Sequence, residues 1–383
     1  MKIIDVETYV LVADNYDPSL TSSAQDTCLV IIKTDEGIEG IGEATFWSQP
    51  KATVAVIDQF RDSLIGKNAN EIDSIWSSFY RSSSFRGAAI GSALSAIDVA
   101  LWDILGKFYN SPVYELLGGK HRNKIRMCAL CMGKDTNETL KLASSAIKLG
   151  YTAIKIDPLP EGFGDWKITK LTNEVVAQVK AVRKAIGQNI DLCVEIHRKL
   201  TPRTAIPLLN SLEEFNLLFI EDPIQPDSID SMAEVSKKTS LPIATGERLH
   251  TIYEFKEILS RNAAVDLKLD VGLQGGFSQC KKIAGMAEAF HATVSPHNGK
   301  GPVLTASHIQ FSASIPNFLI LEYREDPTIS LFNHSLNIKN GYIEIPKTPG
   351  IGIDLKDDIK HNQFNNIKTN PAPTGEDGSV ILQ

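Results

Sequence analysis

The chain has 383 residues, of which 43% are hydrophobic and 22% are charged, and its formal net charge at pH 7 is −7. This length suits two domains or a barrel with an accessory domain, and the composition is typical of a globular protein. The negative charge argues against nucleic acid or an anionic membrane surface as the main partner.

The N-terminal stretch MKIIDVETYVLVADNYD predicts a first strand, because it lacks the apolar core and small-residue cleavage site of a signal peptide. We also expect no membrane span, since such a helix needs a run of about 18 apolar residues. The five cysteines are scattered, and Cys128 and Cys131 are interpreted as buried thiols. Together these features predict a reducing location, the cytoplasm.

Residues 1–46 predict an antiparallel meander, in which IIDVETYVLV is followed by a polar loop and by CLVIIKTDEGIEGIGEAT, with DEG at the turn. Apolar residues of AAIGSALSAIDVALWDILGKF then recur at helical spacing. The predicted helix ends at Asn110, Ser111 and Pro112, and LLGG at 116–119 marks a second stop with glycine caps.

From about residue 123, short apolar runs alternate with amphipathic segments. The apolar runs are KIRMCAL, TAIKID, DLCVEIH, LLFIEDP, LPIATGE, AVDLKLD, ATVSPH and NFLILEY. Such alternation predicts a parallel sheet covered by helices, and eight strands in about 200 residues favour a closed α/β barrel. Beyond about residue 336, GYIEIPKTPGIGI predicts a hairpin, and the polar NPAPTGEDGS is expected to be loose.

Seven of the eight runs end in ionisable residues. These are Lys155 and Asp157, Glu195 and His197, Glu221 and Asp222, Glu247, Lys268 and Asp270, His297, and Glu322. Any one of them alone is more often a solvated loop residue or a structural histidine. In an α/β barrel, however, the C-terminal strand ends form one mouth, where like charges repel unless a cation joins them.

Three glutamates at consecutive strand ends, Glu195, Glu221 and Glu247, are spaced 26 residues apart in both intervals. Their carboxylates can meet around one ion, because neighbouring strands lie about 4.8 Å apart. Oxygen ligands favour a hard cation, so we predict one Mg²⁺ in the site. On one side Asp270 is placed to orient His297 through a hydrogen bond to the ring.

These residues and their order resemble the mandelate racemase branch of the enolase superfamily over essentially the whole chain. The segments that carry the resemblance are GKFYNSPVYELLGGKHR, FIEDP, TGERL and LDVGLQGG. The resemblance implies a modified (β/α)₇β TIM-like barrel at residues 123–335 and an α+β capping domain at 1–122. The tail, 336–383, would return to the capping domain, and both would cover the C-terminal face of the barrel.

The resemblance also implies roles for individual residues. The metal ligands carry over to Glu195, Glu221 and Glu247, the Asp–His dyad to Asp270 and His297, and the electrophile near the enolate to Glu322. Where this family often has a second lysine base on its second barrel strand, the chain has Asp157, and its first metal ligand is Glu195 where aspartate is common.

The Glu-x-His pair of Glu195 and His197 is similar to the gluconate and galactonate dehydratases of this branch. We therefore predict a Mg²⁺-dependent dehydratase that converts an aldonate to a 2-keto-3-deoxy acid. In this prediction His297 removes the α-proton and His197 protonates the departing β-hydroxyl, while Lys155 and, if it is protonated, Glu322 stabilise the enediolate.

Contacts to the sugar are predicted for Asp157, Arg198, Tyr16 and Trp47, the last two in capping loops at 14–26 and 46–50. The expected assembly is a homo-oligomer, from dimer to octamer. The alternatives are a racemase or epimerase of a 2-hydroxy acid, and a non-catalytic metal-binding homologue. A phosphosugar isomerase that grips phosphate with Gly299, Lys300 and Gly301 ranks last.

Overall fold

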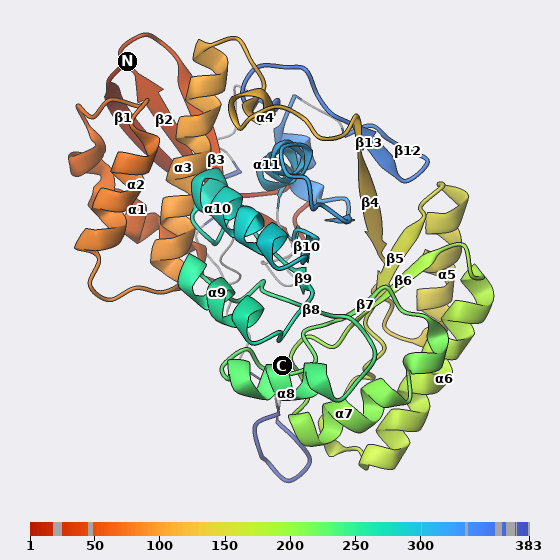
Figure 1. The fold of residues 1–383 in the computed structure, drawn as a ribbon. Coiled ribbons are helices and arrows are strands. Elements are labelled where there is room, and N and C mark those ends of the chain that lie inside the picture. Colours follow the sequence, from red (N-terminus) through yellow and green to blue (C-terminus); the bar gives the residue numbers. More distant parts are fainter. Residues whose placement is uncertain are drawn as a thin grey trace.

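The computed structural model describes residues 1–17, 25–44, 49–299, 301–333, 336–356, 362–364, 372 and 374–381. Figure 1 shows an N-terminal sheet with its helices, in red and orange, against one side of a barrel that runs from yellow to blue. The first unit, here called the cap, contains the antiparallel order β1–β2–β3. Its elements are β1 (Ile3–Val12), β2 (Asp26–Thr34), β3 (Glu39–Ala44), α1 (Pro50–Leu64), α2 (Ile72–Ser82) and α3 (Ala88–Phe108).

The cap is held together by direct packing of β3 on α3. A Cβ at Gly40 or Gly42 would collide with the backbone carbonyl of Ala100 or Ala96, so only glycine allows this approach. By length and mean hydropathy α3 is apolar enough to cross a membrane. Two thirds of that apolar window, 67%, is buried inside the molecule, as in a core helix.

The barrel contains eight parallel strands, as the sequence predicts. Between β10 and β11 the ring is closed by a bridge from Val294 to Phe318 and by the amide of Leu319, which donates to the Val294 carbonyl at 2.9 Å. The strands are β4 (Lys124–Leu130), β5 (Ala153–Ile156), β6 (Asp191–Glu195), β7 (Phe219–Glu221), β8 (Ile243–Thr245), β9 (Asp266–Leu267), β10 (Thr293–Val294) and β11 (Leu321–Tyr323).

A helix follows each of the first seven barrel strands, which is the (β/α)₇β order. Short 3₁₀ turns at Phe163–Asp165, Glu213–Phe215 and Pro327–Leu331 complete the connections, and α4 (Val113–Leu116) leads into the barrel. The barrel helices are α5 (Thr136–Lys148), α6 (Ile168–Ile186), α7 (Pro202–Asn210), α8 (Ile229–Lys237), α9 (Ile252–Ser260), α10 (Gly276–Ala289) and α11 (Pro302–Ala313).

Buried carboxylates of the cap bind the first turns of two barrel helices. Glu43 on β3 accepts hydrogen bonds from the amides of Gly301 and Leu304 at 2.9 and 3.0 Å, where α11 begins. Asp98 on α3 accepts from the amide of Ser278 at 3.2 Å, in the first turn of α10. Carboxylates at these positions satisfy free helix N–H groups. Helices that follow barrel strands begin at the C-terminal strand ends, so these bonds hold the cap at that face.

The tail beyond residue 336 contacts both the barrel and the cap. The hairpin of β12 (Ile338–Lys339) and β13 (Tyr342–Glu344) pairs antiparallel with the first half of β4, at the end of the barrel opposite to the C-terminal strand ends. Gln363 then bridges Leu11 on β1, a contact that supports the proposed return of the tail to the cap. The predicted loose segment is held at 374–381, where the amide of Glu376 donates to Asp165 at 2.9 Å. We propose residues 123–335 as the barrel unit on the basis of these contacts.

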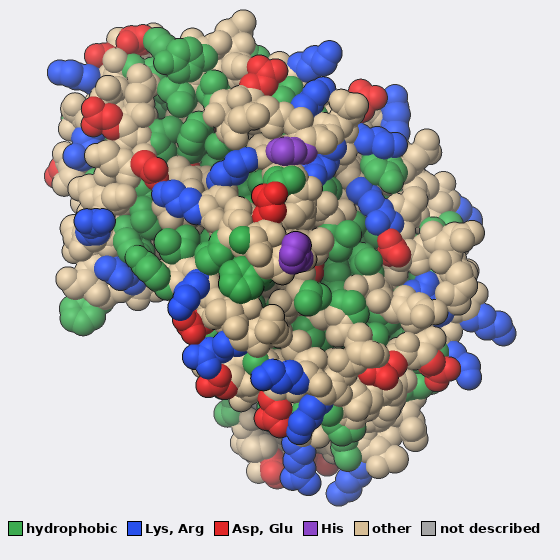
Figure 2. Space-filling model, viewed as in Figure 1, with side chains coloured by type: hydrophobic (Ala, Val, Ile, Leu, Met, Phe, Trp, Pro, Cys, Tyr) green, Lys and Arg blue, Asp and Glu red, His purple; other side chains and the backbone are tan. Residues whose placement is uncertain are grey.

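Figure 2 shows one face of the molecule, on which lysine and arginine side chains are interspersed with aspartate and glutamate. All five cysteines are free and buried, as expected for Cys128 and Cys131.

Candidate active site

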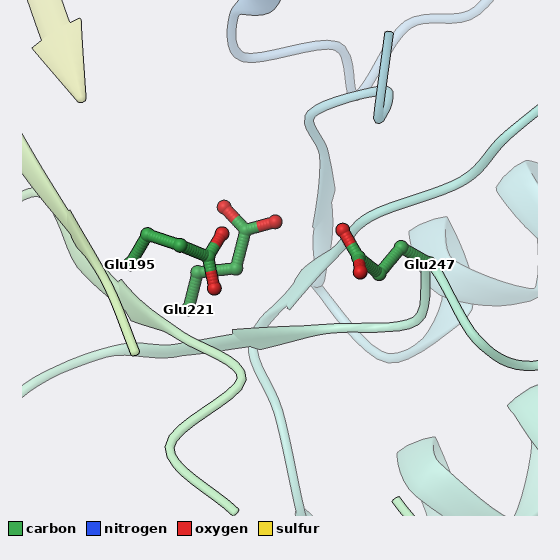
Figure 3. Close-up of side chains that lie close together, drawn as sticks. All are labelled: Glu195, Glu221 and Glu247. Carbon is green, nitrogen blue, oxygen red and sulfur yellow. The ribbon is translucent and has the colours of Figure 1, made fainter. Parts of the chain in front are cut away.

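Three buried glutamates converge at the C-terminal end of the barrel. Glu195 ends β6 and Glu221 ends β7, where they are register partners, and Glu247 lies two residues beyond β8. One carboxylate oxygen from each lies within 4.8 Å of the others. Figure 3 shows the Glu247 carboxylate pointing toward the other two across a common space. This geometry matches the predicted metal ligands.

The donor set fits a divalent cation. Oε1 of Glu221 is buried and has no hydrogen-bond partner among the described residues, which is the condition of a metal ligand without its ion. Burial, and next the neighbouring charge of Glu195, raise the pKa of Glu221 well above its usual range. A bound cation would offset that cost of ionisation.

Two lysines and Glu322 form a buried ion-pair group beside the cluster. Lys155 Nζ lies 3.0 Å from Glu195, 2.8 Å from Glu221 and 2.5 Å from Glu322. Lys268 Nζ also contacts the Glu322 carboxylate and lies 3.4 Å from Glu221. Burial opposes ionisation of Glu322, but the two ammonium groups outweigh it and lower its pKa well below the usual range. In this arrangement the Glu322 carboxylate accepts hydrogen bonds from both lysines.

The predicted dyad is present on one side of the mouth. Nδ1 of His297 lies 2.8 Å from Asp270, and Nε2 lies 3.5 Å from Glu247. Burial opposes protonation of the ring, but the Glu247 carboxylate and the Asp270 hydrogen bond raise the pKa of His297 to about 8. An imidazole oriented in this way can accept a proton from a bound substrate.

A second Asp–His pair lies on the opposite side. Nδ1 of His197 lies 2.7 Å from Asp157, whose carboxylate is also 3.0 Å from Lys199 Nζ. His197 and Arg198 both have left-handed backbones, with φ of 51° and 66°. Such strain in non-glycine residues is common at functional sites. Arg198 turns toward a metal ligand, with NH1 at 2.7 Å from Glu247.

Comparison with known proteins identifies the family. Residues 138–359 match the family described as enolase C-terminal domain-like, and residues 8–118 match the N-terminal domain of mandelate racemase and muconate lactonizing enzyme. The chain belongs to the enolase superfamily, in its mandelate racemase branch.

Curated members of this superfamily resemble the chain over most of their length. A D-galactonate dehydratase of Variovorax paradoxus is 32% identical over 361 residues, 91% of this chain and 94% of that protein. A D-galactonate dehydratase of Ralstonia nicotianae is 31% identical, with coverage of 91% and 94%. A D-galactonate dehydratase family member of Cellvibrio japonicus is 30% identical, with 99% of each chain covered.

Solved structures agree with this membership. A mandelate racemase/muconate lactonizing enzyme-like protein from Roseovarius has a TM-score of 0.88 at 31% identity and covers 96% of this chain and 97% of its own. A mandelate racemase/muconate lactonizing enzyme from Sulfitobacter has a TM-score of 0.88 at 32% identity, with 96% of each chain covered.

One of the three glutamates, Glu247, lines a cavity of about 220 Å³ together with Lys155 and the two histidines. The lining also contains residues that the sequence did not single out: Met132, two residues after β4, Asn298, four residues after β10, and Arg324, directly after β11. The full lining is Leu130, Met132, Lys155, His197, Glu247, His297, Asn298, Gly299, Glu322, Arg324 and Asp326.

In the described part of the chain, the residues predicted to contact the sugar are not found together at the cavity. The ring of Tyr16 packs against Phe364 with 4.7 Å between centroids, and Tyr16 is not part of the cavity lining. Trp47 lies outside the described residues, as do 18–24 and 45–48 of the two capping loops. Asp157 meets His197 rather than the open cavity.

One amide of the proposed phosphate grip is already used, because Gly301 donates to Glu43 at 2.9 Å. Lys300 lies outside the described residues.

Proposed function

We propose that this hydro-lyase of the enolase superfamily dehydrates D-galactonate or a related aldonate to a 2-keto-3-deoxy acid, with one Mg²⁺ in the site. The observation that carries the proposal is the pair of histidines on opposite sides of one cavity. His197 follows β6 and His297 follows β10, which are four strands apart in a ring of eight. Curated relatives named D-galactonate dehydratase support the substrate class.

The ion would be held by Glu195, Glu221 and Glu247. When bound, it supplies positive charge that makes the α-proton of a carboxylate substrate more acidic and orients that carboxylate. Mg²⁺ is the proposal because all three donors are carboxylate oxygens.

The steps assigned to the protein divide between the two sides of the mouth. His297, oriented by Asp270, accepts the α-proton as the α C–H bond breaks. The charge that develops on the substrate carboxylate is stabilised by the ammonium of Lys155, which is almost fully buried and lines the cavity. His197 donates a proton as the β C–O bond breaks, so hydroxide leaves as water, and the enol becomes the keto acid.

A screen of acid sugars tests this proposal. The enzyme with Mg²⁺ is incubated with D-galactonate, D-gluconate and their C2 epimers D-talonate and D-mannonate, and 2-keto-3-deoxy product is measured. We expect turnover of D-galactonate or D-gluconate, because only one side of the mouth carries the α-proton base. Excess chelator and Glu221→Gln are expected to abolish turnover.

One observation favours a second candidate, a racemase or epimerase. Each side of the mouth has an imidazole paired with an aspartate, and two bases on opposite faces are what inversion at the α-carbon requires. Incubation in D₂O separates the candidates. Deuterium incorporation with inversion and without keto acid would replace the dehydratase proposal, and metal binding without either reaction would indicate a non-catalytic homologue.

A further inference from the structure

Two segments of the barrel repeat one local arrangement. Each contains Lys-x-Asp at a strand end, Lys155 to Asp157 across the end of β5 and Lys268 to Asp270 directly after β9. In each, the lysine contacts Glu322 and the aspartate binds Nδ1 of a histidine from the next strand.

The aspartates are also fixed in the same way by their own backbone. Oδ1 of Asp157 accepts from the amide of Leu159 at 3.0 Å, and Oδ1 of Asp270 accepts from the amide of Gly272 at 2.7 Å. This two-residue turn occupies Oδ1, and Oδ2 binds the imidazole at 2.7 Å for His197 and 2.8 Å for His297; Oδ2 of Asp157 also accepts from Lys199 at 3.0 Å. A carboxylate held on both oxygens is a rigid guide for the ring that it binds.

We propose that Asp157 is the positioning residue of His197 and does for it what Asp270 does for His297. The inference rests on the proposed function and deepens it. By accepting the Nδ1 hydrogen, Asp157 sets the tautomer and the plane of the ring, so that Nε2 is the nitrogen presented to the cavity. This positioning role takes the place of the sugar contact that the sequence predicted for Asp157. Asp157 then acts only through the orientation of the His197 ring.

Three variants test the proposal by kinetics: Asp157→Ala, Asp157→Asn and, as the matched control, Lys199→Ala. With D-galactonate as substrate, Asp157→Ala is expected to lower kcat for dehydration by about 10–100-fold, the usual effect of removing an orienting partner, with little change in KM. Exchange of the α-proton in D₂O is expected to persist, because His297 and Asp270 are untouched. Asn can still accept the Nδ1 hydrogen, so Asp157→Asn is expected to recover much of the loss.

Lys199 is the other partner of Asp157, at 3.0 Å, and is therefore the appropriate control. Lys199→Ala is expected to dehydrate at the wild-type rate. An equal loss of kcat in Lys199→Ala would show that the Asp157–Lys199 ion pair, and not the orientation of the His197 imidazole, supports the rate of dehydration. Parallel loss of exchange and dehydration in Asp157→Ala would show general damage to the site, and either result would overturn the proposal.

A spectroscopic measurement tests the pairing without turnover, so it distinguishes failure of this inference from failure of the proposed function. Ring N–H protons bound to carboxylates resonate at low field in proton NMR. We expect Asp157→Ala to lose the His197 signal and keep the His297 signal, with the reverse in Asp270→Ala. Retention of both signals in a folded Asp157→Ala protein, verified by circular dichroism, would refute the assignment.

Discussion

His197 and His297 each bind an aspartate through Nδ1, yet the proposed reaction assigns them different catalytic roles. His297→Asn is expected to lose both dehydration and α-proton exchange, because it removes the base. His197→Asn is expected to lose dehydration by about 10²–10⁴-fold, the usual contribution of a general acid, while retaining exchange in D₂O. The measurement is deuterium incorporation at the α-carbon beside keto-acid formation. Exchange that survives in His297→Asn and vanishes in His197→Asn would reverse the assigned roles.

The part of the site that the sequence predicts is the part that follows from strand position. Glu195 and Glu221 end consecutive parallel strands and Glu247 lies two residues beyond the next one, so their convergence follows from the barrel order. Hydrogen-bond partners are different, because they depend on loop conformation. Neither the left-handed backbone at His197 nor its pairing with Asp157 is visible in the spacing of residues.

The ion pairs of Glu322 show the same limit. Lys268 stands two residues before Asp270 and faces the same side, so its place at the mouth follows from strand periodicity. Its contact with Glu322 depends on side-chain conformation and is not visible in the spacing of residues.

At the scale of elements, most strands and helices follow from hydrophobic periodicity, and α11 shows why one did not. Every residue of Pro302–Ala313 is buried, so the segment has no polar face and no amphipathic period to detect. Its position between the cap and the barrel explains that burial, since Glu43 of β3 covers its first turn. A helix buried on all sides is indistinguishable by periodicity from an apolar loop or strand.

The bond between β3 and α11 predicts a stability effect. Glu43→Ala is expected to lower the free energy of unfolding by roughly 1–3 kcal/mol, because it leaves the buried amides of Gly301 and Leu304 unsatisfied. Denaturant unfolding measures the change. Glu39→Ala, an exposed substitution on the same strand, is the control and is expected to change stability little. Equal effects of the two substitutions would contradict the capping role.

The bond between α3 and α10 predicts a pH dependence. Burial raises the pKa of Asp98 to about 7 from an ordinary value near 3.8. A raised pKa in the folded state means that stability is fully present below pH 3.8 and declines as the pH rises through 7. Asparagine can accept the same hydrogen bond from Ser278 without ionising.

We therefore expect Asp98→Asn to become more stable relative to the wild type as the pH is raised from 5 to 8. One pKa unit corresponds to about 1.4 kcal/mol, so the difference is measurable by denaturant unfolding at each pH. A stability difference between Asp98→Asn and the wild type that does not change with pH would show that ionisation of Asp98 does not destabilise the folded protein.

For the whole molecule, the main electrostatic feature is the excess of carboxylates at the mouth. The Glu195, Glu221, Glu247 and Glu322 side chains are buried together with the ammonium groups of Lys155 and Lys268. Glu247 also pairs with Arg198 at 2.7 Å, but burial and the neighbouring Glu195 still raise the pKa of Glu221, so full ionisation of the cluster is costly until a cation joins it. Metal binding is therefore expected to stabilise the folded chain as well as to support the reaction.

This balance predicts that Mg²⁺ raises the melting temperature of the protein. At a concentration 100 times the dissociation constant, a ligand that binds only the folded state adds about 2.7 kcal/mol. Calorimetry with Mg²⁺ and with excess chelator measures the shift, and Glu221→Gln is expected to reduce it. An identical melting temperature in both conditions would contradict the metal site. The predicted cytoplasmic location and homo-oligomer are separate predictions, and size-exclusion chromatography with light scattering checks the assembly.

The pairing of Gln363 with Leu11 has a consequence for how the protein is made. On its outer edge β1 receives hydrogen bonds from residues 362–364, including one from Asn362 to Val12 across 350 positions of sequence. At typical rates of synthesis of about 5–20 residues per second, this edge waits roughly 20–70 s for its partner to leave the ribosome. During that interval the nascent chain exposes a strand edge that can pair with another chain. Chaperone capture of β1 while the barrel is being translated would protect the chain until its own C-terminal segment arrives.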